Sequence, residues 1–344
     1  MASLPGKLRW GILGVAKIND RLLPAFAKAA SAELRAIASR DLERARQAAQ
    51  AADIATAHGS YEALLDDPAI DAVYIPLPNT LHAEWTRKAA DRGKHVLCEK
   101  PLCPTAAEAR QLIDYCRARG VQLMDGFMWP HHPRTAQLRQ FLDGGNIGEV
   151  RRVTASFTFR MNPLDPQNIR LRSDLGGGSL LDVGCYCVYG IRWAFGAEPT
   201  HAQASARYEY GVDVEMNGLL TFAGGRTGAF DCGFTLPYRG WLEIVGTEGI
   251  VFVPDVWLPP RRATFEIRRG GRYDTEEVVV EGEDQIVSML EDFGRAVLDG
   301  RPLTPSPDEA VRTLAAIDAL TRSARQESGQ PVQIRLDGTA AAIP

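Results

Sequence analysis

The sequence predicts two domains: a doubly wound α/β domain, then an α+β domain with a large open, mostly antiparallel sheet. The chain has 344 residues, a length typical of about two domains. Apolar strand patterns alternate with amphipathic helix patterns at first, which indicates parallel βαβ units. Later, long β-type runs follow one another with turn residues between them. We therefore expect domains at 1–127 and 128–344.

Short apolar runs predict the strands of the first domain. Amphipathic segments lie between them, and Gly93 and Gly120 stand where glycines that end helices are expected. The expected strands are 8–14, 34–40, 72–78, 95–100 and 121–127, and the expected helices are 42–52, 61–67, 80–93 and 105–120.

Longer β-type runs predict the sheet of the second domain. They cover 151–161, 200–210, 214–223, 226–236, 241–247 and 264–269, with helices near 132–142, after Ser179, and at 284–299 and 307–326. One broad face of such a sheet needs a cover. Pairing of two copies would supply it, so we expect a homodimer or higher homo-oligomer through this sheet.

Composition and charge argue against several classes of partner. The net charge of −4 gives no reason to expect nucleic acid, and no apolar run is long enough to span a bilayer. The first residues lack the three regions of a signal peptide, so the expected location is cytoplasmic. Neither the His nor the Cys residues show zinc-ligand spacing, so no metal is expected.

The segment "GILGVAKIND" follows the first strand directly. A dinucleotide fingerprint needs a glycine for the tight turn and a small residue where a pyrophosphate approaches the backbone. Gly14 and Ala16 fill these places, and Asn19 stands where a third glycine is usual. The predicted cofactor-binding residues of this turn are Gly14, Val15, Ala16, Lys17 and Ile18. A strand-to-helix turn without a ligand is the alternative.

The residues after the second strand distinguish the two nicotinamide cofactors. NAD enzymes tend to place an acidic residue there for the ribose hydroxyls. Here Ser39 and Arg40 come first, and a hydroxyl and a guanidinium suit a 2′-phosphate. This favours NADP, with NAD less favoured. In the alternative, Arg40 is a solvated loop residue and Asp41 takes the ribose.

The segment "IPLPNTLH" is predicted to lie along the ribose and nicotinamide side of the cofactor. Its predicted contacts are Leu77, Pro78, Asn79 and His82. Asn79 or Thr80 is also expected to cap the next helix. In the alternative, Asn79 is only a cap and His82 only a surface residue.

The segment "HVLCEKPL" ends an apolar strand in a carboxylate, an ammonium and a proline. Because Pro101 cannot continue a central strand, Glu99 and Lys100 are expected at the carboxyl end of the sheet, where ligands bind. A lysine near bound phosphates and partly desolvated can have a lowered pKa, which suits proton transfer. The bond before Pro101 is also a candidate for the cis form.

The segment "LGGGSLLDVGCYCVYGIRW" predicts a second cluster. Ser179 is the expected helix N-cap, which would place Asp182 and Tyr186 one turn apart on one face. A carboxylate beside a phenol can orient it, and the phenol can exchange a proton with a substrate hydroxyl. In the alternative, Tyr186, Tyr189 and Trp193 form an aromatic core stripe.

Together these segments resemble the glucose–fructose oxidoreductase and inositol dehydrogenase family (Gfo/Idh/MocA). The resemblance covers nearly the whole chain, and "EKP" is its most specific mark. It implies an N-terminal Rossmann domain, a C-terminal domain whose open sheet often pairs in dimers, and hydride transfer with NAD or NADP.

Carried over onto this sequence, the resemblance implies that Lys100 is the catalytic lysine and Asp182 the aspartate of the D-x-G-x-[H/Y] element. Tyr186 occupies its last position, as in glucose–fructose oxidoreductase, dimeric dihydrodiol dehydrogenase and related D-xylose dehydrogenases. The same subgroup implies that residues near the substrate or nicotinamide are Trp129, Asn168 and Arg170. Departures from the family pattern are Ala16, Asn19 and Asp125.

The expected function is NADP-dependent oxidation of a polyol or sugar, with an aldose oxidised at C1. Tyr186 would take the hydroxyl proton, Lys100 would lower the pKa of the tyrosine or relay the proton, and Asp182 would hold the pair in place. The alternatives are a trans-dihydrodiol dehydrogenase, an aldose–aldose oxidoreductase with tightly bound NADP, and a non-catalytic NADP sensor.

Overall fold

The computed structural model describes residues 6–270, 274–326 and 330–336. The chain divides into two compact units, and neither is a single continuous stretch. The first unit consists of Met1–Cys103, Glu108–His131 and Asp284–Asp308, and the second of Pro104–Ala107, His132–Glu283 and Glu309–Pro344.

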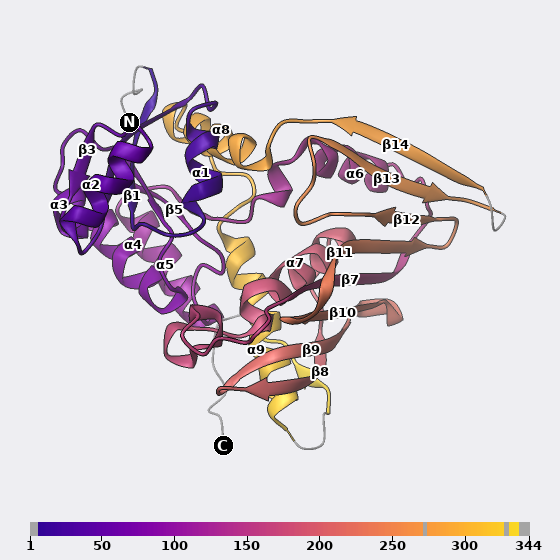
Figure 1. The fold of residues 1–344 in the computed structure, drawn as a ribbon. Coiled ribbons are helices and arrows are strands. Elements are labelled where there is room, and N and C mark those ends of the chain that lie inside the picture. The colour runs from indigo at the N-terminus through magenta and orange to yellow at the C-terminus, as the bar shows by residue number, and fades with distance from the viewer. Residues whose placement is uncertain (1–5, 271–273, 327–329, 337–344) are drawn as a thin grey trace. The chain divides into compact units, whose positions relative to one another are not determined.

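The first unit is built on a parallel sheet of six strands in the order β3-β2-β1-β4-β5-β6 (Figure 1). This confirms the predicted doubly wound fold. The strands are β1 (Leu8–Leu13), β2 (Ala32–Ala38), β3 (Thr56–His58), β4 (Ala72–Ile75), β5 (His95–Cys98) and β6 (Leu123–Asp125). The helices are α1 (Asn19–Phe26), α2 (Leu42–Ala51), α3 (Tyr61–Leu65), α4 (His82–Asp91) and α5 (Ala106–Ala118), with one-turn 3-10 helices η1 (Asn79–Leu81) and η2 (Trp129–His131).

Helix α8 (Gln285–Leu298) completes the core of the first unit, although it comes late in the chain. It lies beside α1 in Figure 1. Its Phe293 ring is 5.0 Å from the Trp10 ring of β1, which in turn packs edge-on against Phe26 at 5.5 Å. The apolar face of α8 therefore covers the sheet that carries the candidate cofactor turn.

The second unit contains a sheet of nine strands in the order β14-β13-β12-β11-β7-β10-β9-β8-β15. It is antiparallel except where β10 pairs in parallel with β7, in agreement with the predicted mostly antiparallel sheet. The strands are β7 (Val150–Arg160), β8 (His201–Glu209), β9 (Val212–Thr221), β10 (Thr227–Gly233), β11 (Thr235–Gly246), β12 (Ile250–Val253), β13 (Arg262–Arg268), β14 (Thr275–Glu281) and β15 (Val332–Gln333). Helices α6 (Pro133–Asp143), α7 (Cys185–Phe195) and α9 (Asp308–Arg325) pack against it.

Two helix starts differ from the sequence prediction. Neither Asn79 nor Thr80 caps α4, because they form the turn η1 and the N-cap position of α4 is Leu81. The helix after Ser179 begins as a π-helical turn, η5 (Leu180–Gly184), and its N-cap has no side-chain hydrogen bond of its own. The Ser179 hydroxyl instead donates to Asp213, for which a local sequence pattern gives no signal.

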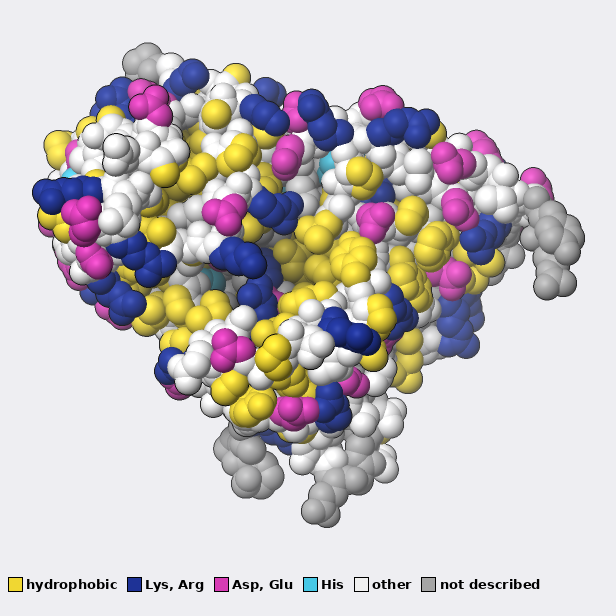
Figure 2. All heavy atoms as spheres, viewed as in Figure 1, with side chains coloured by type: hydrophobic (Ala, Val, Ile, Leu, Met, Phe, Trp, Pro, Cys, Tyr) yellow, Lys and Arg dark blue, Asp and Glu magenta, His cyan; other side chains and the backbone are white. Residues whose placement is uncertain are grey.

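The surface in Figure 2 mixes Lys and Arg with Asp and Glu, and no broad patch of one sign lies on this face. Within the part of the chain that the structure describes, no helix combines the length and the apolar character needed to cross a membrane.

Candidate active site

The turn after β1 has the form that a dinucleotide fingerprint requires. Gly14 has a φ of +136°, a conformation that L side chains rarely adopt, and a Cβ there would lie 3.2 Å from Leu77 Cδ2. Asn19, which replaces the usual third glycine, donates from Nδ2 to the Gly14 carbonyl at 2.9 Å. The Asn19 side chain, although it departs from the usual glycine, therefore stabilises the turn.

The remaining predicted residues of this turn differ in exposure. Val15 and Ile18 pack against the apolar core, and Ile18 is the N-cap residue of α1. Lys17 is exposed, and the Ala16 carbonyl accepts the first backbone hydrogen bond of the following helix from Asn19. A small residue at position 16 leaves the backbone accessible to a phosphate.

The end of β2 carries two arginines. Arg40 is exposed, and Arg44 in the first turn of α2 donates from Nη2 to the Val15 carbonyl at 2.8 Å. Burial raises the pKa of Tyr61, while Arg40 and Arg44 act to lower it, so both guanidinium groups lie near this hydroxyl. The Tyr61 hydroxyl would also lie 3.8 Å from a Cβ at Gly14. Two cations therefore lie beside the turn, and sequence reasoning identified only Arg40.

Asp41 is engaged at the start of α2. Its Oδ1 accepts from the backbone N–H of Glu43 at 2.9 Å and of Arg44 at 3.3 Å, so it is the N-cap. Ser39 is buried, and its Oγ accepts from the Asp41 N–H at 3.2 Å. This arrangement weakens the alternative in which Asp41 takes the ribose.

His82 joins the two loops that follow β4 and β5. It is fully buried, with Nε2 at 2.8 Å from the Leu77 carbonyl and Nδ1 at 3.0 Å from the Pro101 carbonyl. Burial lowers the pKa of His82. His82 was predicted to contact the cofactor, but the structure gives it a supporting position behind the loop that contains Leu77, Pro78 and Asn79.

Glu99 and Lys100 lie at the carboxyl end of β5, as predicted. The Tyr74 hydroxyl donates to Glu99 Oε1, and the Lys100 N–H donates to Glu99 Oε2 at 3.2 Å. The Lys100–Pro101 bond is cis. Asp125 ends the neighbouring strand, opposite Cys98, and burial followed by the Glu99 charge raises its pKa well above the usual range. The Lys100 charge lowers that pKa, which indicates that these three groups lie near one another.

The second unit brings together Asn168, Arg170 and Asp182. Asn168 Oδ1 accepts from the Arg170 N–H at 3.1 Å, and Arg170 Nε donates to Asp182 Oδ2 at 2.6 Å. Asp182 was predicted to orient Tyr186, and its carboxylate is paired with Arg170 in the structure. This ion pair was not foreseen, because Arg170 lies 12 residues away on an irregular segment.

Tyr186 lies in the first turn of α7, and its ring packs in a cluster of aromatic side chains. Its ring is 5.2 Å from that of Phe157, edge-on, and 5.9 Å from that of Trp257. The Trp257 indole is fixed by a 2.8 Å hydrogen bond to the Ser156 carbonyl. Trp129, by contrast, is fully buried in the first unit, in the turn η2 next to α8.

The predicted residues thus form two groups. The cofactor turn, the loop after β4 and Lys100 lie at the carboxyl ends of β1, β4 and β5 in the first unit. Asn168, Arg170, Asp182 and Tyr186 are together in the second unit. Among the described residues, no cluster of three or more His, Cys, Asp or Glu could hold a metal ion.

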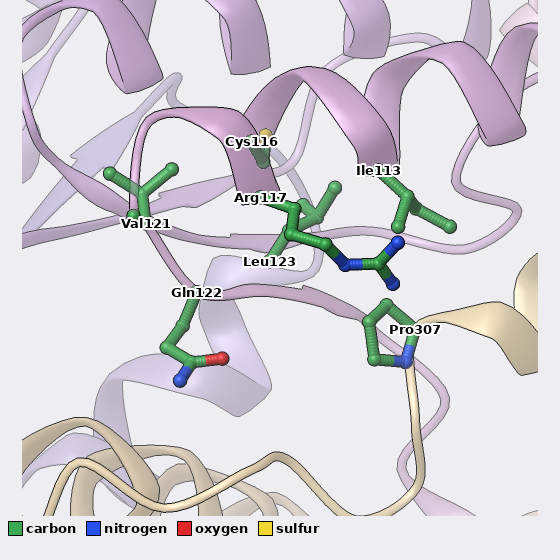
Figure 3. Close-up of a pocket in the computed structure, with 8 residues that line it drawn as sticks. Ile113, Cys116, Arg117, Val121, Gln122, Leu123 and Pro307 are labelled. Atoms are coloured by element: carbon green, nitrogen blue, oxygen red, sulfur yellow. The ribbon is translucent and has the colours of Figure 1, made fainter.

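A separate cavity of about 240 Å³ lies at the other end of β6 (Figure 3). The Arg117 side chain points toward Pro307 across it. Its lining residues are Ile113, Cys116, Arg117, Gly120, Val121, Gln122, Leu123 and Pro307. None of them is a predicted site residue.

A doubly wound unit with a glycine turn after its first strand is typical of dinucleotide-binding domains. The chain belongs to the Gfo/Idh/MocA oxidoreductase family: residues 8–127 match the model "Oxidoreductase family, NAD-binding Rossmann fold", and residues 135–252 match the model "GFO/IDH/MocA C-terminal domain". The resemblance predicted from the sequence is therefore confirmed.

Three relatives illustrate the family's range. The chain is 39% identical over 330 residues, 95% of this chain and 100% of the relative, to D-xylose 1-dehydrogenase (NADP(+)) 2 of Haloferax volcanii. A 3-ketoreductase from Actinomadura kijaniata, solved with NADP and TDP-benzene, has 36% identity and a TM-score of 0.85 over 92% of this chain and 97% of its own. Aldose–aldose oxidoreductase from Caulobacter crescentus, solved with glycerol, has 27% identity and a TM-score of 0.86 over 95% of this chain and 100% of its own.

The ketoreductase has also been solved as variants. In one a tyrosine is replaced by phenylalanine, and in others a lysine is replaced by alanine or by glutamate.

Proposed function

We propose that the protein is an NADP-dependent dehydrogenase of sugar-like alcohols, with an aldose oxidised at C1 as its reaction. The observation that carries the proposal is the presence of both proton-transfer groups in suitable surroundings. Lys100 stands at the ligand edge of the nucleotide-binding sheet, and Tyr186 lies on a helix beside the Arg170–Asp182 pair. The 39% identity to an NADP(+)-dependent D-xylose dehydrogenase supports it.

The preference for NADP rests on the end of β2. Ser39, Arg40 and Arg44 offer a hydroxyl and two guanidinium groups, while Asp41 is engaged as a helix cap. The glycine turn fits the pyrophosphate, because a Cβ at Gly14 would meet Leu77 and Asn19 holds the turn. When bound, the oxidised nicotinamide accepts the hydride.

Residues of the chain itself would transfer the proton. Tyr186 Oη takes the proton of the substrate hydroxyl as the carbon loses its hydride and the C=O bond forms. The ammonium of Lys100 would lower the pKa of Tyr186, so that the phenolate that accepts the proton is available before the step, or would relay the proton. Arg170 and Asp182 hold the helix that presents Tyr186. In the reverse direction, Tyr186 protonates the carbonyl oxygen as it gains charge.

The test is turnover of a panel of aldoses and polyols with NADP⁺, followed by nicotinamide absorbance. Lys100→Ala and Tyr186→Phe are expected to lower kcat by about 10²- to 10⁴-fold, the range of general acid–base catalysis. Lys88→Ala on α4 and Tyr189→Phe on α7 are matched controls and should retain most activity. Near-normal turnover of both Lys100→Ala and Tyr186→Phe would end the assignment.

A second candidate is reduction of a keto sugar carried on a nucleotide. The observation that favours it is the ketoreductase relative solved with TDP-benzene and NADP. Oxidation of NADPH by a nucleotide-linked 3-keto sugar, without turnover of free aldoses, would select this candidate over the first.

Three further possibilities are distinguished by simple measurements. NADP that survives dialysis would support aldose–aldose exchange, and turnover of trans-dihydrodiols alone would support a dihydrodiol dehydrogenase. The aromatic argument for a dihydrodiol is weakened, because Trp129 and Tyr189 are buried and Trp193 lies beneath Arg139. Tight NADP binding without any turnover would indicate a sensor.

A further inference from the structure

The helix that carries Asp182 and Tyr186 receives its N-terminal cap from a distant strand. Asp213, at the start of β9, accepts a hydrogen bond on Oδ2 from the Ser179 hydroxyl at 2.7 Å and from the Leu180 backbone N–H at 2.7 Å. The N-terminal N–H groups of a helix need such an acceptor, and here the local residue Ser179 is a donor to Asp213. A carboxylate also complements the positive end of the helix.

We propose that Asp213 is a positioning residue, which fixes the start of this helix and thereby the places of Asp182 and Tyr186. The inference rests on the proposed function, because it takes these two residues to be part of the catalytic site. The inference goes beyond the proposed function because it assigns a role to Asp213, a residue on another element. Asp213 is at least 33 positions in sequence from Ser179 and Leu180, the two residues that it bonds.

Two glycines before the helix lie in close contact with their surroundings: Gly178 with the Asp213 carboxylate and Gly177 with the Arg170 carbonyl. Gly178 has a φ of +118°, and a Cβ there would lie 2.4 Å from Asp213 Oδ1. Its N–H donates to the Arg170 carbonyl at 2.9 Å. A Cβ at Gly177 would lie 2.6 Å from the same carbonyl. The chain therefore passes closely between Asp213 and the Arg170 segment, and only glycine fits there.

A shift at the helix start would reach the proposed catalytic groups directly. The Asp182 N–H donates to the Gly178 carbonyl at 3.0 Å, and the Asp182 carboxylate is paired with Arg170. The π-helical turn then continues without a break into α7, whose second residue is Tyr186. Asp213 thus holds the beginning of one continuous helical segment, which carries Tyr186 in the first turn of α7.

The surroundings of Asp213 support a specific role for its carboxylate as a hydrogen-bond acceptor. Burial raises the pKa of Asp213 to about 6. The Cys232 thiol lies 3.7 Å from Ser179 Oγ, and Tyr208 on β8 lies near Asp213 and Arg325. The two hydrogen bonds that Asp213 accepts offset the cost of burying its carboxylate.

The test compares Asp213→Ala and Asp213→Asn with Glu215→Ala, a matched control on the same strand that bonds Arg207 and Thr235. Hydrogen exchange of the intact protein reports the backbone at 180–186, and steady-state kinetics reports turnover. Asp213→Ala should speed exchange there and lower kcat by about 10- to 100-fold, with the KM for NADP⁺ within about twofold of the wild type. Asp213→Asn keeps an acceptor oxygen and should restore most of both.

Unchanged exchange at 180–186 in Asp213→Ala would overturn the proposal, and so would faster exchange with an unchanged kcat. Equal effects of Glu215→Ala would also overturn it, because they would mean general loosening of β9. If Asp213→Ala does not fold, Ser179→Ala removes one of the two bonds and must show a smaller change of the same kind. If the wild type turns over no sugar, the proposed function fails, while exchange still decides whether Asp213 holds the helix.

Discussion

We propose that single residues at and just after the end of β2 set the preference of the first unit for NADP. Arg40 followed from its place after an apolar strand, but Arg44 did not, because in sequence it is only a charged residue on an amphipathic helix. Its guanidinium reaches the Val15 carbonyl of the cofactor turn across 29 positions, and only the fold brings the two together. The same holds for Asp213, whose cap on the helix start is equally long-range.

Removal of the Arg40 guanidinium should change cofactor selectivity. A charge-assisted hydrogen bond contributes about 1.5–3 kcal/mol, so we expect Arg40→Ala to weaken NADP⁺ binding about 10- to 100-fold. NAD⁺ lacks the 2′-phosphate, and its affinity should change much less. Titration calorimetry with both cofactors measures this difference. Arg46→Ala, on the following helix α2, is the control. Parallel losses for NADP⁺ and NAD⁺ would contradict the assignment.

Among the elements, those with a strong local pattern were predicted and those without one were not. Strands such as β1, β2 and β7 appeared as continuous apolar or alternating runs. The strands β3, β12, β14 and β15 were not predicted: β3 and β15 have three and two residues, and their pairing depends on neighbours that a local pattern does not show. The π-helical turn η5 was not predicted either: it begins where the Leu180 N–H bonds the distant Asp213, a contact that a local sequence pattern does not show.

Helix α9 carries a partly buried carboxyl, that of Asp318, which should make the free energy of unfolding depend on pH. Asp318 Oδ2 accepts from the Ala106 N–H at 3.1 Å, and burial raises the pKa of Asp318 from 3.8 to about 6. Between pH 4 and pH 6 the folded state therefore binds more protons at this site than the unfolded state. Its contribution to the free energy of unfolding falls as the pH rises through this window.

Asp318→Asn should remove this response. As the pH rises from 4.5 to 7.5, the wild type should lose about 2 kcal/mol of unfolding free energy at this site, and the variant should not. The difference in unfolding free energy between variant and wild type should therefore grow by about 2 kcal/mol over this range. Urea denaturation at the two pH values measures it, with Asp299→Asn at an exposed site as the control. A difference between variant and wild type that does not change with pH would contradict the expectation.

At the scale of the whole molecule, the large sheet presents a face suited to a second copy. Along β11 the buried residues Leu242 and Ile244 alternate with Trp241 on the opposite face, which is only partly buried. The Trp241 ring lies 5.9 Å from Phe252, with Arg239 over the first ring and Arg268 over the second. We propose that this face forms the homodimer interface expected from the sequence.

A charge in the centre of that face should separate the copies. In a two-fold interface each substitution is present twice, so Trp241→Glu would bury two carboxylates near each other. Sedimentation velocity should show a dimer for the wild type and a monomer for the variant, with Leu42→Glu on the first unit as the control. A wild-type monomer at micromolar concentration would refute the interface.

The late position of α8 has a consequence for synthesis. The residues of α8 that close the core around Trp10 are Ile286, Met289, Leu290 and Phe293. They leave the ribosome only after most of the second unit, up to Glu283, has been made. During synthesis, the apolar face of the first unit's sheet that α8 covers therefore stays exposed while most of the second unit is being made. A fragment that ends at residue 131 contains all six strands and the glycine turn but lacks α8. We therefore expect it to bind no dinucleotide.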